Sequence, residues 1–266
     1  MYETHWGLQE SPFRGQTDAR HFYCSPTHEE ALARLDFLIE NRRRLGLVVG
    51  LPGSGKTMLL KVLARQLSTQ GGPLAMVNLL SLDAHGMLWE LASQLGCRPP
   101  RNQASCQLWQ SITDCITANR YQQLSTVIMF DDVDEASPEV LTHLVRLVRH
   151  KPSAEPGLTI VLAADSRGEK CLGRRILELV ELRSELECWE PDDTLSYLRS
   201  SLQRAGTDRP VFAENAVCRL HELTRGVPRR VSNLAEMALL AGAGQHLEQI
   251  DAETVESAYN ELVLGH

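Results

Sequence analysis

The stretch Leu45–Leu60, L-G-L-V-V-G-L-P-G-S-G-K-T-M-L-L, decides the fold. A short apolar run leads into a glycine-rich turn and then into an apolar-periodic segment, a pattern that predicts strand, loop and helix in that order. The turn fits G-x-x-x-x-G-K-[ST], with Gly50, Gly55, Lys56 and Thr57 at the fixed positions. A glycine-rich turn that arises by chance is the alternative, and the flanking strand and helix argue against it. The stretch therefore predicts a loop that binds a nucleoside triphosphate.

The residue types of this loop suit phosphate binding. Glycines lack a Cβ, so backbone N–H groups can close around phosphate oxygens, and the positive end of the following helix points at the same oxygens. Lys56 would supply a point charge for the β- and γ-phosphates of ATP, and the Thr57 hydroxyl would be a ligand of Mg²⁺. The predicted cofactor-binding residues are Gly50, Leu51, Pro52, Gly53, Ser54, Gly55, Lys56, Thr57 and Met58.

The composition is that of an ordinary globular protein, with 266 residues, 43% of them hydrophobic and 23% charged. No apolar run approaches the roughly 20 residues that span a bilayer, and no signal peptide is visible at the N-terminus. The seven cysteines show no C-x-x-C spacing, which favours reduced thiols in the cytoplasm over a metal site or a disulfide framework. The 27 basic and 34 acidic residues give a net charge of −7, which does not favour nucleic acid as a partner.

Strands alternate with helices through the first two thirds of the chain. The predicted strands are 46–49, 74–80, 126–130, 158–163 and 183–189, and the predicted helices between or before them are 27–41, 55–69, 83–95, 104–120, 138–148 and 168–181. This alternation predicts an α/β fold with a parallel sheet, covered by helices, that binds its ligand at the carboxyl ends of the strands.

From Glu190 onward the pattern predicts helices alone, near 192–205, 213–224, 228–243 and 251–262. We therefore place a boundary near Pro191. It separates an α/β nucleotide-binding domain with an N-terminal arm, residues 1–190, from a helical domain, residues 191–266.

Two acids follow the third predicted strand, so that four hydrophobic residues lead into Asp131 and Asp132. This is the Walker B form, in which Asp131 would hold Mg²⁺ and Asp132 would polarise the attacking water. A pair of acids that merely ends a surface strand is the alternative, and the phosphate loop upstream argues against it. Asp134 and Glu135 are nearby acids that compete for the role of the base.

Other polar residues are weaker candidates. Asp165 or Ser166, at the end of the fourth strand, could contact the γ-phosphate or orient the water. In the segment G-V-P-R-R, Arg229 opens a helix and could reach the γ-phosphate. The candidates for an arginine finger that reaches the nucleotide of a neighbouring subunit are Arg174, Arg175 and Arg183, and ordinary helix-surface charge is the alternative for each.

Two clusters near the N-terminus allow two interpretations each. The rings of Phe13, His21, Phe22 and Tyr23 form either a small core under the N-terminal arm or a lining for adenine, in which case Phe22 and Tyr23 belong to the cofactor site. The run Arg42–Arg44 follows a predicted helix. We prefer a solvated helix end, favoured by the helix dipole, over a nucleic-acid patch.

Several segments together resemble the AAA+ ATPases of the general secretion pathway protein A type. They are M-Y-x-x-H-W-G-L-x-x-x-P-F at 1–13, F-Y-x-S-P-x-H-x-E-A-L at 22–32, the phosphate loop, D-D-V-D-E-A-S-P-E-V-L at 131–141 and R-G-V-P-R at 225–229. The resemblance implies an AAA+ core with five parallel strands in the order 5-1-4-3-2 and a C-terminal helical lid. By position, Lys56 and Thr57 look like the Walker A pair, Asp131 the Walker B metal residue, Asp165 sensor 1 and Arg229 sensor 2.

The chain departs from this family in two ways. The family usually has Asp-Glu where this chain has Asp131-Asp132, and full-length secretion members continue into a transmembrane helix and a peptidoglycan-binding domain. We expect an ATPase that uses ATP and Mg²⁺ and couples nucleotide state to assembly of a homo-oligomer and to a protein client. One alternative is a DNA-assembled regulator of the transposition type, and another is a nucleotide-gated scaffold that hydrolyses ATP slowly because of the shorter Asp132.

Overall fold

The computed structural model describes residues 2–13, 21–150 and 157–264. The chain divides into two compact units. An α/β unit contains Pro26–Pro52 and Lys56–Leu186, and a helical unit contains Met1–Ser25, Gly53–Gly55 and Glu187–His266. The N-terminal arm thus groups with the C-terminal helices, an arrangement that the sequence does not predict.

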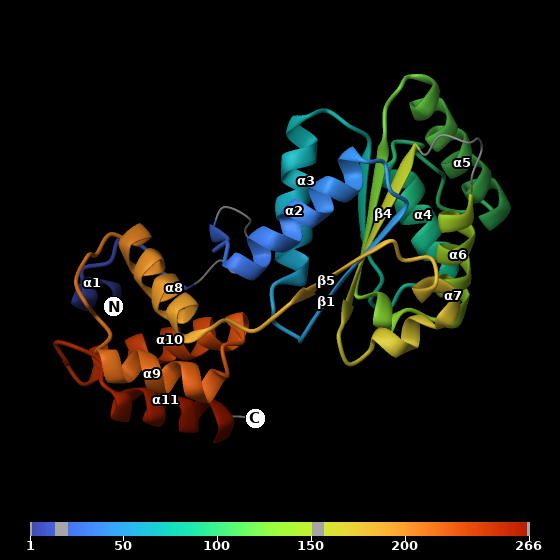
Figure 1. The fold of residues 1–266 in the computed structure, drawn as a ribbon. Coiled ribbons are helices and arrows are strands. Elements are labelled where there is room, and N and C mark those ends of the chain that lie inside the picture. Colours follow the sequence, from blue (N-terminus) through green and yellow to red (C-terminus); the bar gives the residue numbers. More distant parts are fainter. Residues whose placement is uncertain (1, 14–20, 151–156, 265–266) are drawn as a thin grey trace. The chain divides into compact units, whose positions relative to one another are not determined.

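Five parallel strands form the sheet of the α/β unit: β1 (Leu45–Gly50), β2 (Leu74–Asn78), β3 (Thr126–Asp131), β4 (Leu158–Asp165) and β5 (Leu182–Leu186). Their order is β2-β3-β4-β1-β5, which confirms the expected order 5-1-4-3-2. Every residue of β1 and β3 is buried, because a central parallel strand is covered on both faces. The strands all end at one edge of the sheet, where the candidate site lies (Figure 1).

Helices cover both faces of this sheet. They are α2 (Pro26–Glu40), α3 (Lys56–Thr69), α4 (Ala84–Gln94), α5 (Ser105–Tyr121) and α6 (Pro138–Arg149), with the short turns η2 (Val133–Glu135), η3 (Glu169–Leu172) and α7 (Arg174–Leu177). Figure 1 shows α2 and α3 on one face and α4, α5, α6 and α7 on the other. The chain crosses from β1 to the edge strand β2 and then returns across the sheet through β3 and β4. Because these crossovers are right-handed, the helix before β2 and the helices after it lie on opposite faces. One apolar core joins the strands to the second group of helices.

The single helix predicted at 168–181 is not continuous, because the segment contains a short 3₁₀ helix, η3, and a short α-helix, α7. Gly173 separates them with φ of 75°, a value outside the right-handed helical region. The fifth strand also ends at Leu186, three residues before the predicted end, and Glu187 already belongs to the helical unit.

The helical unit contains α1 (Tyr2–Trp6), α8 (Pro191–Arg204), α9 (Glu214–Thr224), α10 (Pro228–Gly244) and α11 (Ala252–Leu264). The N-terminal arm contributes to its core, where the indole Nε1–H of Trp6 donates to the carbonyl of Leu239 at 3.0 Å. Phe13 packs against Tyr197 with ring centroids 5.9 Å apart. Within the described ranges, no helix has the length and hydrophobicity that crossing a membrane requires.

Arg44 lies buried at the other edge of the sheet, with 9% of its surface exposed. Its Nε donates to the carbonyl of Val148 at 2.8 Å, Nη1 to that of Leu158 at 3.3 Å and Nη2 to that of Leu147 at 3.2 Å and to that of His150. Three of these carbonyls lie at the C-terminal end of α6, where the last oxygens of a helix have few partners within it and the helix dipole is negative; that of Leu147 also accepts the N–H of His150. Burial lowers the pKa of the guanidinium.

The expectation that the whole run Arg42–Arg44 is a solvated helix end is therefore wrong for Arg44. Arg42 and Arg43 are exposed, and Arg43 pairs with Glu181 at 3.7 Å. Arg44 differs because it is the residue that leads directly into β1, so its side chain is taken into the covered sheet.

We predict that Arg44→Ala lowers the free energy of unfolding by about 2–4 kcal/mol, because it leaves several buried carbonyls without a donor. The matched change Arg43→Ala removes an exposed ion pair and should alter stability by less than about 0.5 kcal/mol. Urea unfolding followed by circular dichroism measures both. An equal loss in the two variants would contradict the assigned role of Arg44.

Candidate nucleotide-binding site

The predicted phosphate loop joins the end of β1 at Gly50 to the start of α3 at Lys56. Gly53 and Gly55 have φ of 86° and 101°, in the region that favours glycine over any residue with a Cβ. The loop is therefore the tight turn that the sequence predicts, and its glycines are required by the backbone conformation.

Lys56 is buried, and its ammonium is held inside the loop. Nζ donates to the carbonyl of Gly50 at 2.8 Å and to that of Leu51 at 3.2 Å. Burial lowers its pKa, and four carboxylates oppose that shift. They belong to Asp165, Asp134, Asp131 and Asp132. The structure thus gathers the predicted lysine and the predicted acids around one point at the carboxyl edge of the sheet.

Asp131 ends β3 and is fully buried. Its Oδ1 accepts the backbone N–H of Asp132 at 3.1 Å, while Oδ2 has no hydrogen-bond partner among the residues that the structure describes. Burial raises the pKa of the carboxyl group, and the hydroxyl of Thr57 opposes this rise in part. A buried carboxylate oxygen without a donor is costly in isolation and suits a bound cation.

The donor set fits Mg²⁺. The oxygens of Thr57 and Asp131 are hard ligands, and Mg²⁺ in nucleotide sites is held by one or two protein oxygens together with phosphates and water. Over the described ranges, no group of three or more His, Cys, Asp or Glu side chains could hold a metal by itself. A metal at Thr57 and Asp131 would therefore depend on a ligand that brings its own oxygens.

Asp132 is the residue expected to polarise water. Its backbone has φ of 52°, a left-handed conformation in which Asp is among the better tolerated residues. Its Oδ2 accepts a hydrogen bond from Asn78 Nδ2 at 2.7 Å. Asn78 ends β2, and the sequence reasoning missed it, because the strand was predicted to continue to Leu80; a polar residue within that apolar run was the available signal.

Asp134 and Glu135 have different surroundings. Asp134 Oδ1 accepts the backbone N–H of Asp165 at 2.9 Å, and a Cβ added at Gly168 would lie 2.7 Å from the Asp134 Cβ. Asp134 is therefore packed as a link between the segments that follow β3 and β4. Glu135 is exposed. That Asp132, and not either of these two acids, acts on the attacking water stays a prediction.

Asp165 ends β4 and is the register partner of Gly50 in β1. Its carboxylate is bound by Arg167, whose Nη2 donates to Oδ2 at 2.9 Å and whose backbone N–H donates to Oδ1 at 3.0 Å. This hydrogen bonding lowers the pKa of Asp165. Ser166 donates its backbone N–H to the carbonyl of Gly50 at 3.2 Å. The sequence reasoning did not single out Arg167.

The AAA domain family matches residues 39–172, which is half of the chain and includes the phosphate loop and all four acids around Lys56. The chain belongs to the AAA domain family. General secretion pathway protein A of Aeromonas hydrophila is 27% identical over 245 residues, which cover 91% of this chain and 45% of that relative. This confirms the expected resemblance, and the chain spans less than half the length of this relative.

Solved structures share the fold of this AAA-domain protein. Cdc6p from Pyrobaculum aerophilum has a TM-score of 0.72 and 18% identity, with 94% of this chain and 70% of that chain covered. The ORC1 protein of Aeropyrum pernix in complex with DNA has a TM-score of 0.67 and 18% identity, with 90% and 66% covered. The RuvB Holliday junction branch migration motor of Thermotoga maritima has a TM-score of 0.63 and 16% identity, with 95% and 74% covered. At these identities the similarity shows the fold alone.

The arginine-finger candidates of this AAA-domain protein differ in how they are bound. Arg174 pairs with Glu178 at 2.6 Å. Arg183 is held by Glu169 and Glu185, and these hydrogen bonds raise its pKa. Arg175 is exposed.

Other predicted site residues group with the helical unit. Tyr23 packs edge-to-face against Trp189 and Tyr197, at centroid distances of 5.5 and 5.6 Å, so its ring belongs to the core of that unit. Burial raises the pKa of its hydroxyl. The backbone N–H of Arg229 donates to the carbonyl of Gly53 at 3.1 Å, within the same unit. The roles of Phe22 and Tyr23 toward adenine and of Arg229 toward phosphate stay predictions.

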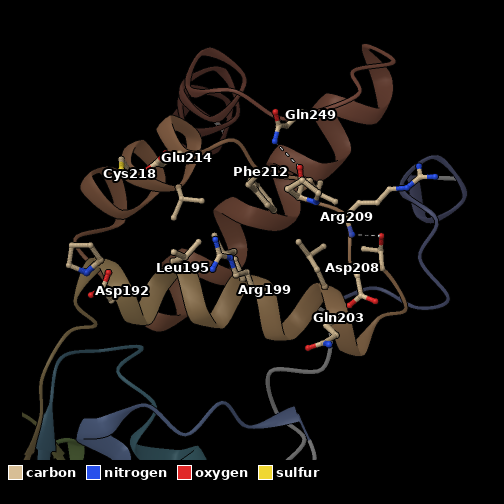
Figure 2. A pocket seen from close by; sticks show the side chains of 17 residues that line it. Asp192, Leu195, Arg199, Gln203, Asp208, Arg209, Phe212, Glu214, Cys218 and Gln249 are labelled. Atoms are coloured by element: carbon tan, nitrogen blue, oxygen red, sulfur yellow. Dashed lines mark hydrogen bonds between the residues drawn. The ribbon is translucent and has the colours of Figure 1, made fainter.

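The helical unit of this AAA-domain protein also contains a separate hollow with a volume of about 790 Å³. Its walls are α8, the beginning of α9 and the loop between them, and Figure 2 shows Leu195 and Arg199 rising from α8 toward Phe212. The floor is apolar, and the rim carries charges of both signs, from Asp192, Arg199, Asp208, Arg209 and Glu214. None of the residues predicted to bind nucleotide lines it.

We predict that Asp134→Ala lowers the free energy of unfolding by about 1–2 kcal/mol, because the backbone N–H of Asp165 loses its acceptor. The neighbouring change Glu135→Ala removes an exposed side chain and should cost less than about 0.5 kcal/mol. Urea unfolding of the two variants provides the comparison. A larger loss for Glu135→Ala would show that the link between the two segments is not made by Asp134.

Proposed function

We propose that this AAA-domain protein binds ATP with Mg²⁺ and hydrolyses it to ADP and phosphate. The observation that carries the proposal is the buried ammonium of Lys56 in a glycine-rich loop, together with a buried oxygen of Asp131 that has no hydrogen-bond partner among the described residues. A buried ammonium and a buried carboxylate oxygen at the same edge of the sheet suit a ligand that is both anionic and metal-bound. A nucleoside triphosphate with Mg²⁺ is such a ligand.

Each residue of the site has a separate task in this proposal. Lys56 exchanges the carbonyls of Gly50 and Leu51 for the β- and γ-phosphate oxygens. When bound, Mg²⁺ would supply positive charge that offsets the charge of the phosphates, and Thr57 and Asp131 are the residues that would hold it. Asp132 accepts a proton from the attacking water, and Asn78 fixes the direction of the Asp132 carboxylate through the bond at 2.7 Å.

We predict that Lys56→Ala weakens binding of an ATP analogue by more than about 100-fold, whereas Arg65→Ala, on the exposed face of the same helix, leaves it unchanged.

Asp132→Asn should retain ATP but lower turnover by about 100-fold or more, because an amide cannot accept the proton. Glu135→Gln is the matched control and should keep its turnover. Binding is measured by calorimetry and turnover by phosphate release. Normal turnover in Asp132→Asn with loss in Glu135→Gln would reassign the base.

We also infer that nucleotide state is coupled to assembly of a homo-oligomer, because an arginine at 174, 175 or 183 would complete the site of a neighbouring subunit. The exposed Arg175 is the strongest candidate, since Arg174 and Arg183 already have acidic partners. A protein client and a location in the cytoplasm remain part of the proposal, and the location rests on the cysteine pattern of the sequence.

A regulator that assembles on DNA is the second candidate function. Two structural neighbours, ORC1 of Aeropyrum pernix and the Drosophila ORC, were solved in complex with DNA, although the similarity to them shows the fold alone. The Arg42–Arg44 run is a poor DNA contact, because Arg44 is buried and Arg43 faces Glu181. Robust DNA binding takes roughly six to ten basic contacts. We therefore favour a protein client.

Assembly and DNA binding can be tested together. We predict that the ATP analogue increases the molecular mass measured by light scattering, that specific activity rises with protein concentration, and that Arg175→Ala removes this rise. Added duplex DNA at about 150 mM salt should change neither result. Activity that is independent of concentration in a demonstrated monomer would contradict the assembly proposal. Growth of the particle only with DNA, together with a steep salt dependence, would favour the second candidate.

A further inference from the structure

The candidate site is acidic for one that would bind a polyphosphate. Four carboxylates act on the buried ammonium of Lys56, and ATP would add further negative charge. Among these acids, Asp165 has the largest effect on the pKa of Lys56. Any nucleotide phosphate that replaces the carbonyls now bound to Lys56 would therefore come close to the Asp165 carboxylate and be repelled by it.

Arg167 is placed to offset this repulsion. Its guanidinium approaches both oxygens of Asp165, with Nη2–Oδ2 at 2.9 Å, Nε–Oδ2 at 3.3 Å and Nε–Oδ1 at 3.4 Å. The backbone N–H of Arg167 also donates to Asp165 Oδ1, so the side chain and main chain act on one carboxylate. The Asp165 side chain is 18% exposed and that of Arg167 69% exposed, which leaves the guanidinium at the solvent side of the pair.

The turn that carries this pair is fixed to the phosphate loop. Asp165 lies opposite Gly50 in the β1–β4 register, and Ser166 donates its N–H to the Gly50 carbonyl that also accepts Lys56. Asp134 accepts the N–H of Asp165 from the other side. The main chain of Asp165 is thus fixed beside the phosphate loop, and its carboxylate is held there by the N–H and the guanidinium of Arg167, so its charge has to be balanced in place.

We propose that Arg167 is a positioning residue that neutralises Asp165 beside the phosphate loop and thereby sets how tightly the site binds nucleoside triphosphate relative to diphosphate. This inference rests on the proposed function. Lys56 would bind the β- and γ-phosphates, and Asp165 lies beside Lys56. Because ADP lacks the γ-phosphate, the charge of an unneutralised Asp165 should weaken binding of ATP more than binding of ADP. Arg167 acts through Asp165 and does not itself contact the nucleotide.

The test uses the full chain with Mg²⁺ and two fluorescent nucleotides, a non-hydrolysable ATP analogue and ADP. Arg167→Ala should weaken binding of the analogue by about five- to tenfold and binding of ADP by less than about twofold. Arg167→Lys keeps the charge and should stay within about twofold of the wild type. Arg219→Ala, which removes an exposed arginine paired with Glu222 and Glu256 in the helical unit, is the matched control and should change neither nucleotide.

The double variant decides the mechanism. If Arg167 acts by neutralising Asp165, then Arg167→Ala should have no effect on nucleotide affinity once Asp165→Asn has removed the negative charge. The double variant Asp165→Asn/Arg167→Ala should therefore bind the ATP analogue with the affinity of Asp165→Asn, within about twofold. A loss that persists in this background would overturn the inference, and so would unchanged binding in Arg167→Ala. Should Arg167→Ala fail to fold, Arg167→Gln gives the same readout. Absence of nucleotide binding in the wild type would instead overturn the proposed function.

Discussion

The candidate site depends on the carbonyl oxygen of Gly50. It accepts the ammonium of Lys56 at 2.8 Å and the backbone N–H of Ser166 at 3.2 Å. Because Gly50 ends β1 and Ser166 follows β4, this one oxygen joins the phosphate loop to the neighbouring strand. A buried ammonium requires such acceptors, since little water reaches it. The loop therefore holds its lysine in place before a ligand arrives, and a phosphate oxygen has only to replace a carbonyl, which keeps the cost of reorganisation low.

The sheet and most of its helices could be predicted because their signals are local. Short apolar runs, the glycine-rich turn and the acids after the third strand each mark an element within a few residues, and the parallel order followed from the family resemblance. Asp131 and Asp165 each end a strand, and because the strands are parallel, both residues lie at the same edge of the sheet. The helix predicted at 168–181 failed for a local reason as well, because Gly173 adopts a positive φ that the apolar pattern does not reveal.

The residues that the sequence reasoning missed are those whose meaning depends on distant partners. Arg44 binds carbonyls more than 100 residues away in the chain, so nothing in the run of three arginines distinguishes it from its exposed neighbours. Asn78 binds Asp132 at a separation of 54 residues. From its charge alone, Arg44 is predicted to be solvated. In the structure it leads into a sheet that is covered on both faces, so its guanidinium needs hydrogen-bond acceptors in the interior.

The residue type at position 132, Asp in place of the longer Glu, suits the left-handed backbone conformation of that residue. A left-handed φ of 52° is tolerated better by Asp than by a longer acid, and the Asn78 amide holds its carboxylate in one direction. Asp131, Asp132, Asp134 and Asp165 nevertheless repel one another, and such clustering lowers stability unless cations or backbone donors compensate it. Lys56, Arg167 and the N–H groups of Asp132 and Asp165 supply part of that compensation. Asp131 Oδ2, which has no hydrogen-bond partner among the described residues, lacks such compensation, and in the proposed function a metal bound together with nucleotide would supply it.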